Sequence, residues 1–366
     1  MASGHFYTSY RSDQRLFKTG WMRFWTVVSV ALLVYLPFVL TTRTFLGINL
    51  SYSQLLGMSL VQVNFALVAI IGAVALNLLT GYTGLISIGS AGFFAVGAFA
   101  GGVFGVQWGW PFPLVLLLSG VLGAGIGALV GLPSLRVRGL YLLLATLGFH
   151  FISAYLFLRY QVKYFGPFGI SYEDPSLFGW AVETDTRWYF LLVALTAVAI
   201  VVTKNVLRTR EGRAFIAIRD RDIAAASAGV NLAKTKLKAF AFSSFLLAVA
   251  GTLYSYYLSN ATADIFTLGL AIDFVAMIII GGMGSITGAV MGALLWQLLP
   301  QVIQTIQLEV GPEAPVAGDF LQQHAAQLQD MLLGLIIILI LVFKPDGLNG
   351  IWVSTKRFFQ RWPYTT

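Results

Sequence analysis

Long uninterrupted apolar runs are the feature of this sequence that most restricts how the chain can fold. The hydrocarbon core of a bilayer is about 30 Å thick, and a helix of roughly 20 apolar residues crosses it. A transmembrane β-barrel would show short segments that alternate apolar and polar residues, which these runs do not. The sequence therefore predicts ten spans, at residues 24–40, 59–79, 86–107, 112–131, 140–160, 188–203, 238–259, 266–281, 285–304 and 330–343.

Composition supports this interpretation. Hydrophobic residues make up 58% of the chain and charged residues only 10%, whereas soluble domains carry about 25% charged residues. So few charges cannot cover a soluble body of this size, which argues against a soluble enzyme, a disordered protein and a nucleic-acid-binding protein. We expect an all-α, polytopic transmembrane bundle, because helices satisfy their own backbone groups in lipid. The absence of cysteine excludes disulfides, thiolate metal sites and a cysteine nucleophile.

The distribution of basic residues predicts the topology. If the N-terminus is cytoplasmic and the ten spans alternate, 19 of the 23 basic residues fall on the cytoplasmic side, as the positive-inside rule requires. The net charge of +8 is then mainly a topology signal, with contact to anionic membrane lipids as a second role. We expect cytoplasmic tails at 1–23 and 344–366 around a transmembrane domain at 24–343, with a cytoplasmic segment at 204–238 and outer loops at 161–187 and 305–329.

Ionisable residues inside the spans are few, and they mark candidate functional positions. His150 and Asp273 lie on different spans, so they form neither a metal site, a catalytic dyad nor a proton relay. We interpret His150 as a hydrogen-bonded packing residue, while Asp273 fits packing and function equally well. The chain also lacks the G-x-x-x-x-G-K-[ST] loop that binds nucleotide phosphates. We therefore expect no enzyme activity, no metal and no cofactor in this chain, and an energy source outside it.

Two glycine-rich runs, 81–92 and 281–288, lie at the ends of predicted spans. Close helix packing is one interpretation, as for the small-residue stripe Gly123, Gly127 and Gly131. The other is a pair of broken segments that line a substrate route, as in many transporters. Under the second interpretation the translocation-path candidates are Gly84, Ser87, Gly89, Ser90, Phe93, Phe94, Gly281, Gly282 and Gly284.

The segment 204–238 contains an alanine-rich stretch that ends at Gly229. A glycine at this place is typical of a helix C-cap. The predicted helix is short, half apolar and flanked by charge, which suits a groove on a partner protein. The alternative is an interfacial helix that lies on anionic lipid.

Taken together, these motifs resemble the LivM-type permease of bacterial branched-chain amino acid ABC importers. The resemblance runs from about Ile70 to Trp352, with the motifs in family order. They are G-Y-T-G-L-I-S-I-G-S-A-G-F-F-A-V-G-A-F, L-R-V-R-G-L-Y-L-L-L-A-T-L-G-F, G-R-A-F-I-A-I-R-D-R-D-I-A-A-A-S-A-G-V-N-L-A-K-T-K-L-K-A-F-A-F-S, I-I-G-G-M-G-S-I-T-G and F-K-P-D-G-L-N-G-I-W.

The resemblance implies that 212–231 is the coupling segment that docks into a cytoplasmic ATPase. The residues that match this motif are Arg213, Arg219, Asp222, Ala224, Ala225 and Gly229. It also implies a second, related permease subunit, two ATP-binding subunits that hold ATP and Mg, and an extracytoplasmic solute-binding protein. The sequence departs from the family pattern at Ser90, where members often have histidine, and at Asp222, where they often have glutamate.

The leading interpretation is therefore a permease subunit in the bacterial cytoplasmic (inner) membrane that forms the path for a small polar solute, expected to be branched-chain amino acids. A urea or short-amide importer permease of the same type is an alternative. A secondary transporter or channel is another, although an ion-coupled carrier would need more intramembrane carboxylates than Asp273.

Overall fold

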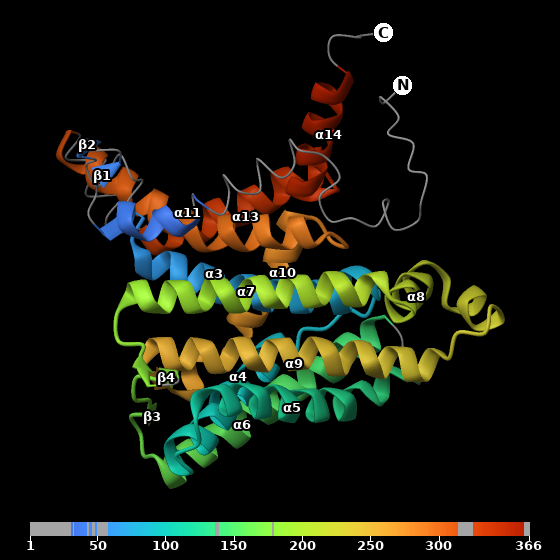
Figure 1. Ribbon diagram of the computed structural model, residues 1–366. Coiled ribbons are helices and arrows are strands. Elements are labelled where there is room, and N and C mark those ends of the chain that lie inside the picture. The colour runs from blue at the N-terminus through green and yellow to red at the C-terminus, as the bar shows by residue number, and fades with distance from the viewer. Residues whose placement is uncertain are drawn as a thin grey trace.

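The computed structural model describes residues 31, 33–41, 44–45, 48–49, 58–135, 139–177, 179–313 and 325–361. Long helices run side by side and alternate in direction (Figure 1). This confirms the predicted all-α bundle. The helices are α3 (Leu60–Leu76), α4 (Ser90–Gly101), α5 (Phe112–Gly131), α6 (Leu140–Tyr164), α7 (Asp185–Arg208), α8 (Arg210–Ser227), α9 (Leu232–Leu258), α10 (Leu268–Gly281), α11 (Ile286–Glu313), α13 (Ala325–Phe343) and α14 (Gly347–Arg361).

Among the described residues, seven helices are long and apolar enough to cross a membrane, and the bent pair α13–α14 makes an eighth if its two helices count as one span. These match eight of the ten predicted spans. The predicted span 266–281 corresponds to α10, which has only 14 residues. Of the predicted span 24–40, the structure describes residues 31 and 33–40, which are helical, and the rest lies outside the described residues. The total of ten spans therefore remains a prediction.

Several predicted boundaries shift because the helices extend past the apolar runs. Helix α7 continues to Arg208 and α9 begins at Leu232, so the segment predicted at 204–238 contains the ends of both helices as well as α8. The predicted outer loop 161–187 shortens in the same way, since α6 ends at Tyr164 and α7 begins at Asp185. Much of the predicted loop 305–329 is helical, because α11 reaches Glu313 and α13 begins at Ala325.

Helix α4 lies at the centre of the bundle, and all 12 of its residues are buried. It crosses α9 at two glycines. A Cβ on Gly97 would overlap the carbonyl oxygen of Ala248, and one on Gly251 would overlap that of Phe94. The backbones of the two helices are therefore in direct contact, which only glycine permits here.

The small-residue stripe on α5 serves the same purpose against α9. A Cβ on Gly123 would lie 2.8 Å from the carbonyl oxygen of Ser244, and one on Gly131 would lie 3.1 Å from the Phe240 side chain. The middle residue, Gly127, packs on the Ser244 side chain. The packing interpretation of this stripe is confirmed.

The connection between α6 and α7 is attached to the bundle at the end opposite α8. Strand β3 (Ile170–Ser171) pairs antiparallel with β6 (Asn260–Ala261), with Ile170 opposite Ala261. Beside this pair, the buried Tyr172 hydroxyl donates to the carbonyl oxygen of Ala98 at 2.5 Å. Burial raises the pKa of Tyr172, so its hydroxyl stays protonated as a donor at neutral pH. The other strands are the pairs β1 (Thr44–Phe45) with β2 (Ile48–Asn49) and β4 (Ser176–Leu177) with β5 (Trp180–Ala181).

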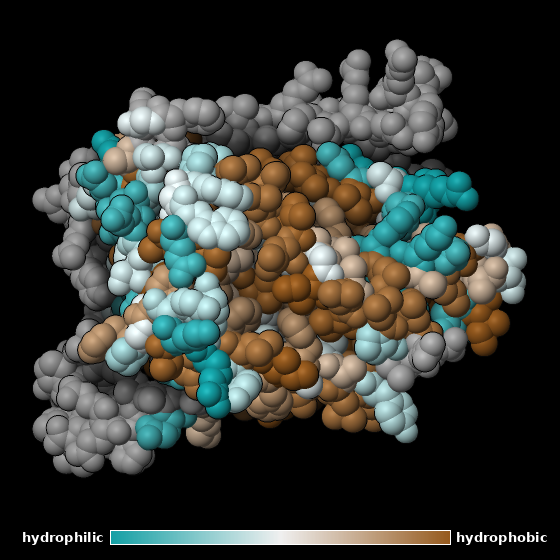
Figure 2. All heavy atoms as spheres, turned by 90° about the horizontal axis from the view of Figure 1, so that it is seen from below, coloured by the Kyte–Doolittle hydropathy of each residue, from teal (hydrophilic) through white to brown (hydrophobic). Residues whose placement is uncertain are grey.

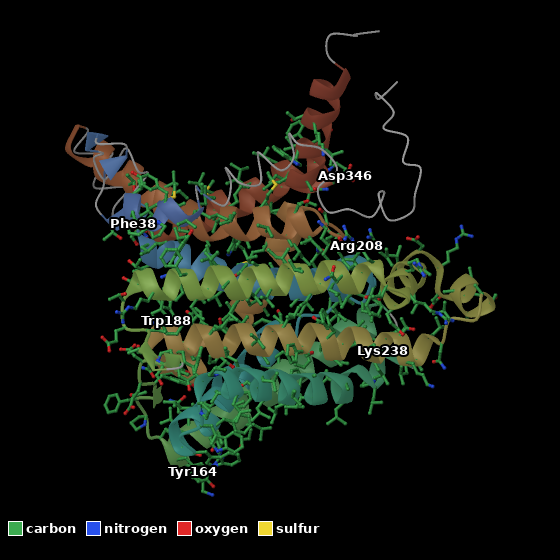
Figure 3. The ribbon with its side chains drawn as sticks, viewed as in Figure 1. Phe38, Tyr164, Trp188, Arg208, Lys238 and Asp346 are labelled. Carbon is green, nitrogen blue, oxygen red and sulfur yellow. The ribbon has the colours of Figure 1, made fainter. Side chains whose placement is uncertain are left out.

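The surface has an apolar belt between two polar ends (Figure 2). On α5 and α6 the exposed apolar side chains include Leu117, Leu144, Phe151, Ile152 and Leu156. In Figure 3, Arg208 and Lys238 lie at the end of the bundle that carries α8, while Trp188 and Tyr164 lie at the opposite end. This belt faces lipid in a membrane, and the two ends define its two sides.

Candidate functional site

Helix α8 carries the predicted coupling segment and consists of two pieces. The backbone of Arg221 has φ −157° and ψ 106°, which breaks the helix at that residue. The first piece packs on α7 and α9 through the buried side chain of Phe215. The second piece, 222–227, projects from the end of the bundle (Figure 1).

The second piece ends as the sequence predicts. Gly229 has φ +83°. Its N–H donates to the carbonyl oxygen of Ala226 at 3.0 Å, and the N–H of Val230 donates to that of Ala225 at 3.0 Å. This pair of bonds is the Schellman motif, in which a left-handed residue satisfies the last carbonyl groups of a helix. The chain then turns directly into α9, whose N-terminus is capped by the Asn231 side chain.

The projecting piece exposes an apolar side chain. Ile223 is 73% exposed, and Ala224 is exposed beside it. Of the other motif residues, Arg213, Arg219 and Gly229 are exposed, Asp222 is half-buried and Ala225 is buried. The motif residues therefore lie on both sides of the break: Arg213 and Arg219 precede it, and the other four follow it.

A pocket of about 520 Å³ lies between the start of α8 and the turn into α9. Basic side chains from both helices line it, and Glu211 forms an ion pair with Lys238 at 2.5 Å. Both partners of this pair are solvent-exposed, so its contribution to stability is small.

The two glycine-rich runs come together at the α8 end of the bundle, an outcome that their sequence separation does not reveal. Asn77, at the start of the π-helical turn η1 (Asn77–Tyr82), connects them with its side chain. Its Oδ1 accepts from the N–H of Gly284 at 2.9 Å, and its Nδ2 donates to the carbonyl oxygen of Ser285 at 2.9 Å. Asn77 is buried, so both bonds are shielded from water and costly to break.

A third loop, from the closing motif, completes this cluster. A Cβ on Gly347 would lie 2.5 Å from the backbone nitrogen of Gly282. The hydroxyl of Thr287 donates to Oδ1 of Asn349 at 2.8 Å. We call residues 81–84, 281–285 and 346–350 the glycine junction. Asp346 lies at the same end of the bundle as Arg208 (Figure 3).

The sequence did not single out Asn77, although a polar amide in an apolar run was a usable signal. Nor did it indicate that Arg219 reaches the glycine junction. A Cβ on Gly84 would lie 3.3 Å from Cα of Arg219, and one on Gly284 would lie 2.5 Å from its Nη1. Both glycines have positive φ, +72° and +81°, so the geometry of each turn also favours glycine.

The other path candidates lie inside the bundle. Ser90 is fully buried at the start of α4, and its hydroxyl points to the carbonyl oxygen of Ala271 on α10 at 3.4 Å. Ser87, also buried, accepts from the N–H of Gly89 at 3.2 Å. Phe93 packs on Phe149 of α6, with ring centroids 4.5 Å apart.

Further candidates pack between helices. Phe94 packs on aromatic rings of α9 and α10, Tyr254 and Phe274. A Cβ on Gly281 would overlap the backbone of Gly288, so this glycine lets α10 and α11 approach closely.

The two intramembrane ionisable residues lie apart from the glycine junction. His150 is buried on α6, and its Nδ1 has no hydrogen-bond partner within the described part of the chain. Asp273 is half-buried on α10. Within the same described part, no three His, Cys, Asp or Glu side chains come close enough to hold a metal ion.

The apolar belt and the spanning helices together define a multi-pass helical membrane protein. The chain belongs to the family described as "Branched-chain amino acid transport system / permease component", whose family model matches residues 57–341. It is thus a permease component of the branched-chain amino acid ABC transport type, located in the inner membrane.

Curated relatives include three LivM proteins. The "High-affinity branched-chain amino acid transport system permease protein LivM" of Salmonella typhimurium is 30% identical over 306 residues, which cover 77% of this chain and 68% of the relative. The protein of the same name from Escherichia coli K12 is 29% identical with the same coverage. A "Probable branched-chain amino acid transport permease protein LivM" of Methanocaldococcus jannaschii is 28% identical over 64% of this chain and 67% of its own length. No solved structure matches the chain significantly.

Proposed function

We propose that this chain is one of two related permease subunits in a bacterial importer for branched-chain amino acids. The observation that carries the proposal is the family match across residues 57–341 together with the LivM relatives. The complete importer would contain a second permease, two ATP-binding subunits and an extracytoplasmic solute-binding protein. ATP and Mg would bind to the ATP-binding subunits, since this chain lacks the phosphate-binding loop.

The projecting piece of α8 is the surface that we assign to the ATPase. An exposed isoleucine on a short capped helix is costly to leave in water and fits a groove on a partner. Its break at Arg221 separates this piece from the part of α8 that packs on the bundle. The ATPase can therefore hold one piece of α8 while the other stays attached to the spans.

We also propose that the translocation path passes beside the run 81–92, at the interface of α4 with α10. The backbone between η1 and α4 is non-helical at 83–89, and such backbone offers hydrogen bonds that apolar helix faces lack. Because Ser90 is buried against Ala271, this proposal requires α10 to separate from α4 when the path opens.

Reconstitution tests the function. We would assemble this chain with its partner permease, ATPase and binding protein in proteoliposomes, and measure uptake of labelled leucine, valine and urea with and without internal ATP. We expect ATP-dependent uptake of leucine and valine. Urea uptake in their place would favour the amide importer, and uptake by this chain without the ATPase would favour a secondary transporter.

A cysteine-labelling experiment tests the proposed orientation. The chain has no native cysteine, so one introduced thiol is its only label site. Ser176 in β4 and Ser354 in α14 are exposed at opposite ends of the bundle. In intact cells a membrane-impermeant maleimide should label Ser176→Cys and leave Ser354→Cys unlabelled, while both react after permeabilisation. Labelling of Ser354→Cys from outside would contradict a cytoplasmic α14.

A further inference from the structure

The guanidinium of Arg219 lies at the glycine junction, on the bundle side of the break in α8. The break follows two residues later, at Arg221, and the exposed Ile223 lies beyond it. Arg219 is therefore on the piece of α8 that packs against the spans. Its contacts are with Gly84 at Cα and Gly284 at Nη1. One residue thus reaches from the connection after η1 to the turn between α10 and α11.

The parts that Arg219 touches are joined to each other. Asn77 holds η1 to Gly284 and Ser285 through two hydrogen bonds of 2.9 Å. The turn at Gly282 packs on the backbone of Gly347. A displacement of the turn 281–285 therefore carries η1 and the loop 346–350 with it, because closely packed elements transmit movement rather than absorb it.

We propose that Arg219 is a positioning residue that transmits movement of α8 to the η1 end of α3 and to the turn between α10 and α11 at once, and that it does not contact the ATPase. This inference rests on the proposed function and deepens it. ATPase closure can shift the spans only if α8 makes different contacts in two states of the path. Arg219 supplies such a contact, because its planar guanidinium is rigid and its backbone is packed on Gly84.

The fit around Arg219 explains the glycines on both sides. An added Cβ at Gly284 would meet Nη1 at 2.5 Å, so Gly284→Ala should displace the guanidinium. Removing the guanidinium should relieve the part of this defect that comes from the overlap, while the strain of alanine at φ +81° remains. A contact shared by two residues shows such non-additivity, whereas two independent defects would add.

The test uses the complete reconstituted importer. Arg219→Ala should retain the ATPase on co-purification and keep its basal ATP hydrolysis within about twofold, but lower solute transported per ATP by about tenfold, within the usual range of coupling factors. Gly284→Ala should lower the same ratio. The double variant should be less impaired than the sum of the two single effects, because only the strain of alanine at Gly284 adds to the loss of the guanidinium. Arg208→Ala, an exposed basic residue at the end of α7, is the matched control and should couple normally.

Arg219→Lys keeps the charge and most of the length of the side chain but loses the planar guanidinium. Its coupling should therefore lie between those of Arg219→Ala and the wild type. If Arg219→Ala does not assemble with the other subunits, Arg219→Lys replaces it in the test. Three results would overturn the proposal: normal coupling in both Arg219 variants, loss of the ATPase on co-purification, or additive effects in the double variant. Failure of the wild-type chain to recruit an ATPase or to transport would instead refute the proposed function.

Discussion

Gly251→Leu is expected to abolish the folded, monodisperse protein. The helices α4 and α9 touch through their backbones at this position, where any Cβ would overlap the carbonyl oxygen of Phe94. Overpacking a core typically costs about 1–3 kcal/mol, and here the obstacle is backbone that no rotamer change can move. Gly251→Ala should lower by several degrees the temperature at which half of the monodisperse protein is lost, and Gly97→Ala should do the same. Size-exclusion chromatography of heated, detergent-solubilised samples measures both.

Gly125 provides the matched control. It lies on α5, where a Cβ would meet nothing within 4 Å. Gly125→Leu should therefore give a normal elution profile, and Gly125→Ala should be neutral or slightly stabilising, because alanine is favoured over glycine in helices by roughly 0.8–1 kcal/mol. Normal thermal stability of Gly251→Leu would contradict direct backbone contact between α4 and α9.

Ile223→Asp is expected to prevent the ATPase from binding while leaving the permease folded. Ile223 is 73% exposed on the projecting piece of α8, so aspartate costs the isolated chain little. Within a docking groove it would place an unpaired charge against apolar surface. Truncation of a hot-spot residue at the centre of an interface costs about 2 kcal/mol or more, which corresponds to a loss of affinity of roughly 30-fold. Co-purification of the tagged permease with the ATPase measures the loss.

Ile223→Leu is the control for this experiment, because it keeps an apolar side chain of the same size. It should retain the ATPase at the wild-type level. If Ile223→Asp also retained the ATPase fully, the projecting piece would not be the docking surface. Ile223→Asp should keep the elution profile and thermal stability of the wild-type permease. This result would separate a docking defect from misfolding.

Much of the fold was predictable, because single segments carry it. The apolar runs at 59–79, 112–131 and 238–259 each became a spanning helix, since lipid leaves a long apolar segment few other conformations. The C-cap at Gly229 also followed from local sequence, because only nearby residues form a Schellman motif. Span ends were less predictable. Helix α10, of 14 residues, is too short for the usual length criterion but is packed between α3 and α11.

The candidate site was predictable only in part. The glycine-rich runs were found, but their meeting through Asn77 was not, because it joins residues more than 200 positions apart. The six motif residues matched the coupling motif in sequence, but the break at Arg221, which separates Arg213 and Arg219 from the other four, was not predicted. A break in the middle of a helical segment without proline or glycine leaves no local signal.

The sequence by itself determined the class of protein, since the number of charges and the length of the apolar runs leave no stable alternative to a helical membrane bundle. It also determined the family, through motifs that follow one another in a recognisable order. Only the tertiary structure decided which glycines are helix contacts and which are turns. It places Gly97 and Gly251 against backbone, and Gly84 and Gly284 around Arg219. The physical reason is that glycine removes a side chain without specifying a neighbour, so the packing of the other helices determines what occupies the space.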